Sequence, residues 1–133
     1  MKAIETRTAI LSVDEKGINI VKTKKLDQTL EDAVENVQAS KSLGAGKKIP
    51  MLCDIRDIIS QTRDCQLYYT GKEAQEVYLA VALIIGSPIS KILGNFFIGL
   101  RSQNNNVPLK MFNDEKIAYQ WLESFLEASS EST

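Results

Sequence analysis

Residues 79–85 form an unbroken run of apolar side chains that stops at a Gly-Ser-Pro sequence. A strand covered on both faces has this character, because a parallel sheet between two layers of helices leaves no side chain facing water. A buried helix is the alternative, since periodicity alone does not separate the two. The short run and the sharp stop at residues 86–88 favour the strand. The sequence therefore predicts a central strand of an α/β sheet.

The chain of 133 residues is long enough for one domain with its own core. We expect a single domain over residues 1–133, with a core at about residues 8–126 and a disordered tail at 127–133. The net charge of −1 gives no overall field that would attract nucleic acid. No apolar stretch approaches the roughly 18 residues of a membrane span, and the first residues lack the apolar segment of a signal peptide. We therefore expect a cytoplasmic protein that does not span a membrane.

Strand and helix patterns alternate along the first two thirds of the chain. Residues 8–22 contain two β-rich runs around a polar turn, which predicts a hairpin. Apolar residues then recur at helical spacing over 27–43, and a second apolar run at 49–55 predicts another interior strand. Residues 62–77 fit either one kinked helix or two short helices. A capping-box pattern in the middle of this segment favours two.

The helix that follows the central run has a clear start. Ser87 is its predicted N-cap and Pro88 its first residue, where a proline costs no hydrogen bond. We expect its apolar stripe to pack in the core: Ile89, Ile92, Leu93, Phe96, Phe97 and Leu100. Residues 107–112 predict an edge strand, because the proline within them cannot donate to a sheet ladder. Asn113 is expected to cap the last helix.

The predicted order of elements is β-β-α-β-α-β-α-β-α. Residues 87–97 contain the helix start after the central run, and residues 110–122 join a short strand to a helix with an Ala-x-x-Trp-Leu pattern at 118–122. This order and these segments resemble the SpoIIAA-like branch of the STAS superfamily over about residues 9–126. The resemblance implies an α/β fold with a mixed, mostly parallel sheet of about five strands and helices on both faces.

The resemblance also implies where a regulatory site would lie. In the sporulation members of STAS, a strand that ends in aspartate leads to an Asp-Ser-Ser-Gly helix start, and phosphorylation of its serine switches partner binding. Asp54 corresponds to the aspartate at the strand end. Residues 59–64 depart from the serine motif. Only Ser60 or Thr62 is left as a substitute phosphoacceptor.

The residue types present argue against catalysis. The chain has no histidine, which removes Ser-His and Cys-His nucleophilic pairs and the commonest metal ligand. Its two cysteines form neither a zinc motif nor a disulfide framework. Asp54, Asp57 and Asp64 follow one strand, but Arg56 and Arg63 lie between them, which favours solvated ion pairs over a Mg²⁺ or catalytic site. We expect no enzyme activity, no catalytic residue, no metal and no cofactor.

The best candidate site is the sheet edge where helices begin. Helices starting near Thr62, Ser87 and Asn113 would each follow a parallel strand, so their free N–H groups could bind an anion there. Alternatively, each cap only satisfies its own helix. The candidate residues for a partner or an anion lie after strand ends or at helix starts: Asp54, Arg56, Asp57, Ser60, Thr62, Arg63 and Ser87.

Two functions follow from this sequence. The leading interpretation is a non-enzymatic, STAS-like regulatory or protein-interaction domain with an unidentified protein partner, and a homodimer is left open. The alternative is a binding or carrier module for a hydrophobic, lipid-like molecule beneath the helix that carries Phe96 and Phe97. A closed apolar cavity would favour the carrier, and a filled core would favour the interaction domain.

Overall fold

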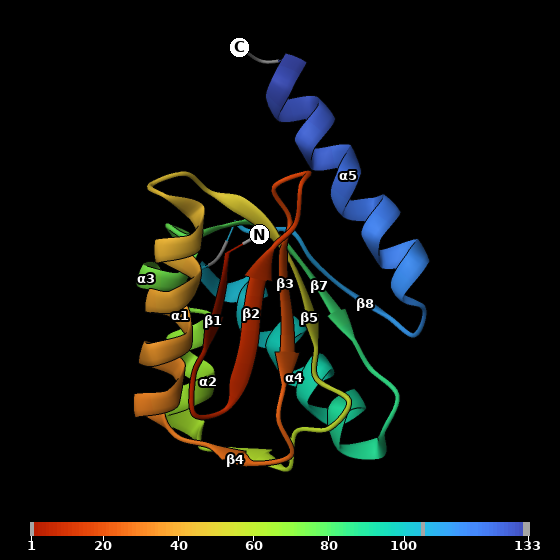
Figure 1. Cartoon of the computed structure of the whole chain (residues 1–133). Helices are drawn as coiled ribbons and strands as arrows, with labels where there is room; N and C mark the ends of the chain where they lie inside the picture. The colour runs from red at the N-terminus through yellow and green to blue at the C-terminus, as the bar shows by residue number, and fades with distance from the viewer. Residues whose placement is uncertain (1, 105, 132–133) are drawn as a thin grey trace.

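The computed structural model describes residues 2–104 and 106–131 and is built around a six-stranded sheet (Figure 1). Its strands, in spatial order, are β1 (Ala3–Glu5), β2 (Ala9–Val13), β3 (Asn19–Thr23), β5 (Ile49–Asp54), β7 (Tyr78–Ile84) and β8 (Leu109–Phe112). The first two pairings are antiparallel and the other three are parallel. The short strands β4 (Asp27–Gln28) and β6 (Ser60–Gln61) form a separate parallel pair.

The predicted mixed, mostly parallel sheet is confirmed, with one strand more than expected. The additional strand is β1, whose three residues carry too little pattern to be recognised from the sequence. The apolar run at 79–85 corresponds to β7, which pairs with β5 and β8 and so lies one place from the sheet edge. The strand at 107–112 is the edge strand β8, as predicted.

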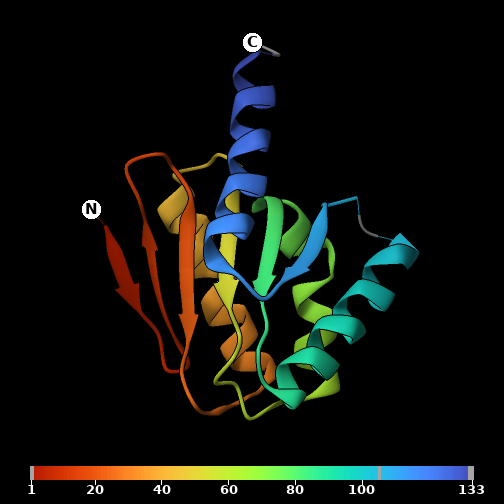
Figure 2. The same cartoon turned by 90° about the vertical axis from the view of Figure 1, so that its right-hand side faces the viewer.

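Five helices cover the sheet on both faces (Figures 1 and 2). They are α1 (Leu30–Gly44), α2 (Arg63–Tyr69), α3 (Lys72–Gln75), α4 (Pro88–Asn104) and α5 (Glu115–Glu131). The segment at 62–77 forms two short helices, as favoured above, with Thr70 and Gly71 between them. None of the helices in the described part of the chain combines the length and apolar character that crossing a bilayer requires.

The unbroken apolar run of β7 is explained by a core on each side of it. Val81 and Leu83 join the larger core, which also holds buried residues of α1, α3 and α4. The alternate residues of β7 face the smaller core, beneath α5, where Ala118 and Leu122 are fully buried. Because side chains alternate along a strand, only a strand covered on both faces needs seven apolar residues in a row.

Helix α4 buries less of its stripe than the spacing predicts. Leu93 and Phe97 are buried, but Ile89 and Ile92 are 45% and 68% exposed. The reason is the position of α4 beside β8, where the sheet ends and covers only one side of the helix (Figure 2). Phe96 is half-buried, and the side chain of Leu100 lies outside the described residues.

The end of the chain differs from two expectations. Asp114, not Asn113, caps α5, because the Ile117 N–H donates to Asp114 Oδ1 over 3.1 Å. Residues 127–131 are helical and do not form the expected disordered tail; residues 132–133 lie outside the described part. A helix that is already nucleated gains one hydrogen bond for each residue it adds, so α5 extends beyond its buried turns.

Candidate functional site

The carboxyl end of β5 holds a cluster of charged side chains centred on Asp54. Arg56 donates to both carboxylate oxygens of Asp54, from Nε over 3.0 Å and from Nη2 over 2.7 Å. Lys22 on β3 donates to the same carboxylate over 2.9 Å and also contacts Asp57 at 3.2 Å. Arg56 reaches Glu115 at the start of α5 over 2.6 Å. The cluster therefore ties together β3, β5 and α5.

This environment keeps Asp54 charged. Burial raises the pKa of its carboxyl, but hydrogen bonds from Arg56 and Lys22 outweigh burial and lower the pKa to about 2. A general base that works at neutral pH needs a pKa nearer to 7. Both oxygens of Asp54 are also engaged by the two cations. The geometry therefore gives Asp54 a role in holding the strand ends together.

The predicted phosphoacceptors lie on the surface beside this cluster. Ser60 is exposed on β6, and its hydroxyl donates to Asp27 on β4. Thr62 is exposed and caps α2 by accepting from the Cys65 N–H over 3.3 Å. Its hydroxyl donates to Asp64. Each hydroxyl thus has a local partner, and both remain at the surface.

The start of α4 uses two serines. Ser87 Oγ accepts from the Ser90 N–H over 3.0 Å, as its predicted N-cap role requires. Ser90, which is fully buried, accepts at Oγ from the N–H groups of Gly86 and Ser87, each over 2.9 Å. These contacts support the alternative in which each cap satisfies its own helix. Ser90 was not predicted as part of this helix start, although its position three residues after the cap resembles a capping box.

Arg63 lies apart from the Asp54 cluster, against the exposed side of α4. Its guanidinium carbon is 6.0 Å from the ring centroid of Phe96. Among the described residues, no carboxylate forms a salt bridge with Arg63. We define the α2–α4 face as Arg63 together with four exposed or half-buried apolar side chains of these two helices, Leu67, Ile89, Ile92 and Phe96.

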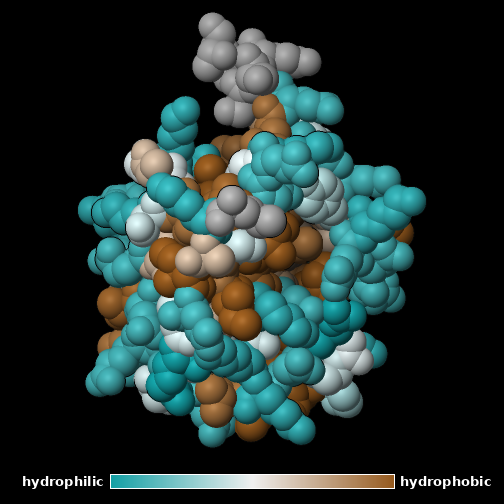
Figure 3. All heavy atoms as spheres, viewed as in Figure 1, coloured by the Kyte–Doolittle hydropathy of each residue, from teal (hydrophilic) through white to brown (hydrophobic). Residues whose placement is uncertain are grey.

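Large apolar side chains also reach the surface elsewhere, among them Leu30 and Val34 on α1 and Ile59 before β6. The view in Figure 3, onto the β1 and β2 side of the sheet, shows hydrophilic residues around a few apolar patches. Ile10 on β2 is 48% exposed, and Ile117 on α5 is 56% exposed. Single exposed apolar residues are normal for a folded protein. On the α2–α4 face, one aromatic ring lies beside an arginine, and three exposed aliphatic side chains belong to the same two helices.

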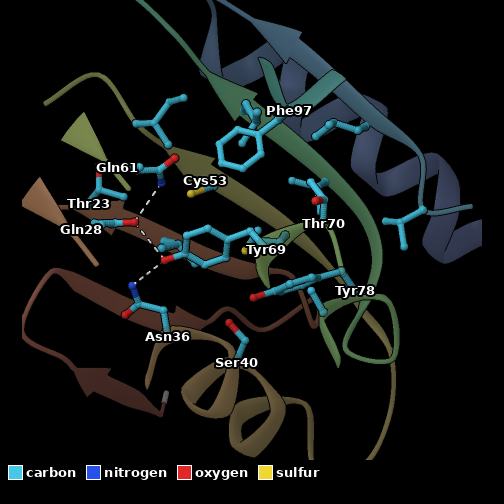
Figure 4. Close-up of a pocket in the computed structure, with 18 of the residues that line it drawn as sticks. Thr23, Gln28, Asn36, Ser40, Cys53, Gln61, Tyr69, Thr70, Tyr78 and Phe97 are labelled. Carbon is cyan, nitrogen blue, oxygen red and sulfur yellow. Dashed lines mark hydrogen bonds between the residues drawn. The ribbon is translucent and has the colours of Figure 1, made fainter. Parts of the chain in front are cut away.

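The interior holds a second candidate site, a cavity of about 90 Å³ between the sheet and helices α1 to α4. Apolar side chains from β2, β3, β5 and β7 line most of it, and Phe97 from α4 lies on its helix side (Figure 4). A hydrogen-bonded row of polar groups, Asn36, Tyr69, Gln28 and Gln61, lines one part of the wall. Thr23, Ser40, Thr70 and Gln75 also line the cavity. Within the described residues, Gln61 Oε1 is buried without a hydrogen-bond partner.

No pattern in the sequence predicts this polar wall. Gln28 and Gln61 lie in β4 and β6, two strands of two residues that pair with each other across a long stretch of chain. Neither strand is long enough to show a pattern. Within the described part of the chain, no group of three cysteine or acidic side chains has the arrangement of a metal site.

Comparison with solved structures identifies the class of fold. The fold is SpoIIAA-like: it resembles the crystal structure of an uncharacterized protein of the DUF3478 family with a SpoIIAA-like fold from Shewanella loihica PV-4. The TM-score is 0.64, the identity is 17%, and the match covers 92% of this chain and 99% of that chain. Residues 12–126 match the family described as a domain of unknown function, DUF7793, and the chain belongs to that family. No curated protein matches.

Proposed function

We propose that this chain is a non-enzymatic interaction domain that binds a protein partner through the α2–α4 face. The observation that carries the proposal is Arg63, an exposed cation that forms no salt bridge with the described residues and lies over the half-buried ring of Phe96. Interfaces are enriched in arginine and aromatic residues, and an arginine can bind a carboxylate with two parallel hydrogen bonds. The partner chemistry that fits is a carboxylate next to an apolar side chain.

The groups that could catalyse a reaction are otherwise engaged, which supports a binding role. Asp54 is held ionised by Arg56 and Lys22. Burial raises the pKa of Cys53 and of Cys65 to about 12, so both remain thiols at neutral pH. A thiol is a poor nucleophile compared with a thiolate. Two buried free cysteines also suit the reducing cytoplasm, where we propose that the domain acts.

The sequence predicted a partner site at residues 54–63 and 86–88. We now propose that Arg63, at the end of the first of these segments, makes the main contact. Arg63 remains a proposed contact. Asp54 and Arg56 are engaged with each other, so we propose that they support the edge instead of binding a partner directly. Regulation by phosphorylation at Ser60 or Thr62 stays a prediction, supported by the exposure of both hydroxyls.

The test is a pull-down from native lysate with wild type, Arg63→Glu and Lys48→Glu. Lys48 is an exposed cation that precedes β5, at the opposite end of that strand from the Asp54 cluster, and it provides the matched charge reversal. We expect only Arg63→Glu to lose the captured partner. Losing a charge-assisted contact at the centre of the interface costs roughly 2–5 kcal/mol of binding free energy. Circular dichroism checks that all three proteins are folded.

Equal yields from all three proteins would show that the α2–α4 face is not the interface. The exposed side of α5, with Lys116 and Gln120, would then be the next candidate. If the captured partner is a second copy of this chain, the domain is a homodimer. Size-exclusion chromatography of the purified protein reports that outcome directly.

The cavity favours a second function, the binding of a small molecule, and its volume limits the size of that molecule. A cavity of about 150 Å³ is known to bind benzene, and this one, at about 90 Å³, is smaller. A lipid-like chain is therefore larger than this space. A smaller ligand fits, and its chemistry can be inferred from the residues around it.

A further inference from the structure

We propose that the cavity between the sheet and helices α1 to α4 binds a small neutral molecule with a compact apolar body and one hydrogen-bond donor. Short-chain alcohols are the simplest members of this class. The site lies inside the larger core, whereas the proposed partner surface lies on the outside of α2 and α4. The two proposals therefore rest on different residues, and either can fail without the other.

A chain of hydrogen bonds fixes the polar end of the site (Figure 4). Thr6 donates to Asn36 Oδ1 over 2.6 Å, and Asn36 Nδ2 donates to the Tyr69 hydroxyl over 2.9 Å. Tyr69 in turn donates to Gln28 Oε1 over 3.0 Å, and Gln61 Nε2 donates to the same oxygen over 2.9 Å. Each donor is thus committed to an acceptor. The amide of Gln61 is held with Nε2 toward Gln28.

This orientation leaves Gln61 Oε1 as the free end of the chain. Figure 4 shows the amide oxygen of Gln61 on the side away from Gln28, toward the part of the cavity near Phe97. The oxygen is buried, and no donor among the described residues reaches it. A buried acceptor without a partner is costly, so a ligand that brings an O–H or N–H group gains a hydrogen bond that the protein alone does not provide.

The remaining wall sets the charge of the ligand. Among the described residues, those that line the cavity include no aspartate, glutamate, lysine or arginine. Burial raises the pKa of Cys53 to about 12 and also raises the pKa of Tyr78 and Tyr69, so all three are neutral at physiological pH. A buried ligand charge would have no opposite charge to pair with, which is strongly unfavourable. The site therefore selects neutral molecules.

The volume and shape of the cavity limit the size of the ligand. Leu11, Val21, Val81 and Leu83 form the sheet side of the cavity, and Phe97 lies on the helix side. The cavity is smaller than the roughly 150 Å³ that accepts benzene. A branched alcohol with four carbons matches an apolar space of this size with one polar corner. A phenyl ring is larger than this space.

The test uses three probes of similar shape on the wild-type protein: isobutanol, isobutyl chloride, which has no donor, and isobutylamine, which is charged at neutral pH. Methyl-labelled NMR spectra report binding through saturable shifts at Leu11, Val21, Val81 and Leu83. We expect isobutanol to bind roughly threefold to tenfold more tightly than isobutyl chloride, which is the worth of one neutral hydrogen bond. Isobutylamine should cause no shift at these methyl groups.

Variants of the protein test whether Gln61 Oε1 accepts the hydrogen bond from the ligand. Gln61→Met removes the acceptor at similar length, so it should abolish the preference for the alcohol while the chloride still binds. Gln38→Met, on the exposed side of α1, is the matched control and should behave as wild type. Ala74→Leu adds three carbons at the cavity wall and should abolish binding of both neutral probes.

Several results would overturn the proposal. Equal affinity for isobutanol and isobutyl chloride would show that Gln61 Oε1 does not select a donor. Methyl groups unmoved by all three probes would show that the cavity holds only solvent. Both measurements use the wild-type protein, so they stand even if a variant does not fold. Arg63→Glu should leave probe binding unchanged, which separates this test from the test of the partner surface.

Discussion

Asp54 shows how an ion pair at a strand end is stabilised against its own burial. Its carboxylate is 11% exposed and carries hydrogen bonds from Arg56 and Lys22. The sequence predicted that Asp54 would lie at the end of an interior strand. Lys22 was not predicted as its partner, because that contact depends on β3 pairing with β5, which are separated by all of α1.

Replacing Asp54 with asparagine should destabilise the protein by about 1–2 kcal/mol at pH 7, after allowance for the partial exposure of both cations. The pKa of Asp54 falls from an ordinary value of 3.8 to about 2 in the folded state. Its stabilisation is therefore complete above the unfolded pKa and is lost as the pH falls through the folded pKa.

Urea denaturation of wild type and Asp54→Asn measures this difference. The difference in the free energy of unfolding between the two proteins should roughly halve near pH 3 and approach zero below pH 2. Asp57→Asn is the control, because Asp57 contacts the same lysine but is 55% exposed and should contribute less. A difference between wild type and Asp54→Asn that does not change with pH would contradict the assignment of a lowered pKa to Asp54.

At the scale of single elements, α4 is the helix whose start was predicted and whose packing was not. Ser87 and Pro88 begin the helix as expected, since caps depend on local chemistry. The apolar stripe predicted burial for Ile89 and Ile92, which are exposed. Periodicity shows that a helix has an apolar side, but not how wide a surface the sheet offers to cover it.

Ser90→Ala should destabilise the helix start more than Ser87→Ala. Ser87 contributes one cap, worth about 1 kcal/mol. Ser90 is fully buried and accepts from two backbone N–H groups, so its loss leaves both without that acceptor, at about 1–3 kcal/mol. Thermal unfolding of the two variants ranks them, and the reverse order would contradict the hydrogen-bond assignment.

The two glycines of α4 should respond in opposite ways to alanine. A Cβ at Gly94 would lie 2.3 Å from Met111 Sδ, so Met111 must move. A Cβ at Gly99 would meet no atom within 4 Å. Gly94→Ala should cost about 1–3 kcal/mol, whereas Gly99→Ala should stabilise by up to about 1 kcal/mol through helix propensity. Chemical denaturation measures both, and a stabilising Gly94→Ala would show that α4 packs less closely on β8.

For the whole molecule, local patterns were enough to predict the class of fold and Arg63 as a candidate contact, but not the cavity or the extent of the α2–α4 face. The run at 79–85 predicted a strand buried on both faces, and β7 indeed lies between two cores. The cavity depends on contacts between distant segments, such as the pairing of β4 with β6. The α2–α4 face depends on where the sheet ends. Neither property is encoded in the spacing of residues along one element.

Amide NMR mapping with the purified partner shows whether the α2–α4 face binds it. We expect the largest shifts on α2 and α4, around Arg63, Leu67, Ile89 and Ile92, and we expect Arg63→Glu to weaken them while the spectrum remains that of a folded protein. Shifts confined to α5, or shifts around α2 and α4 that Arg63→Glu leaves at full strength, would contradict it.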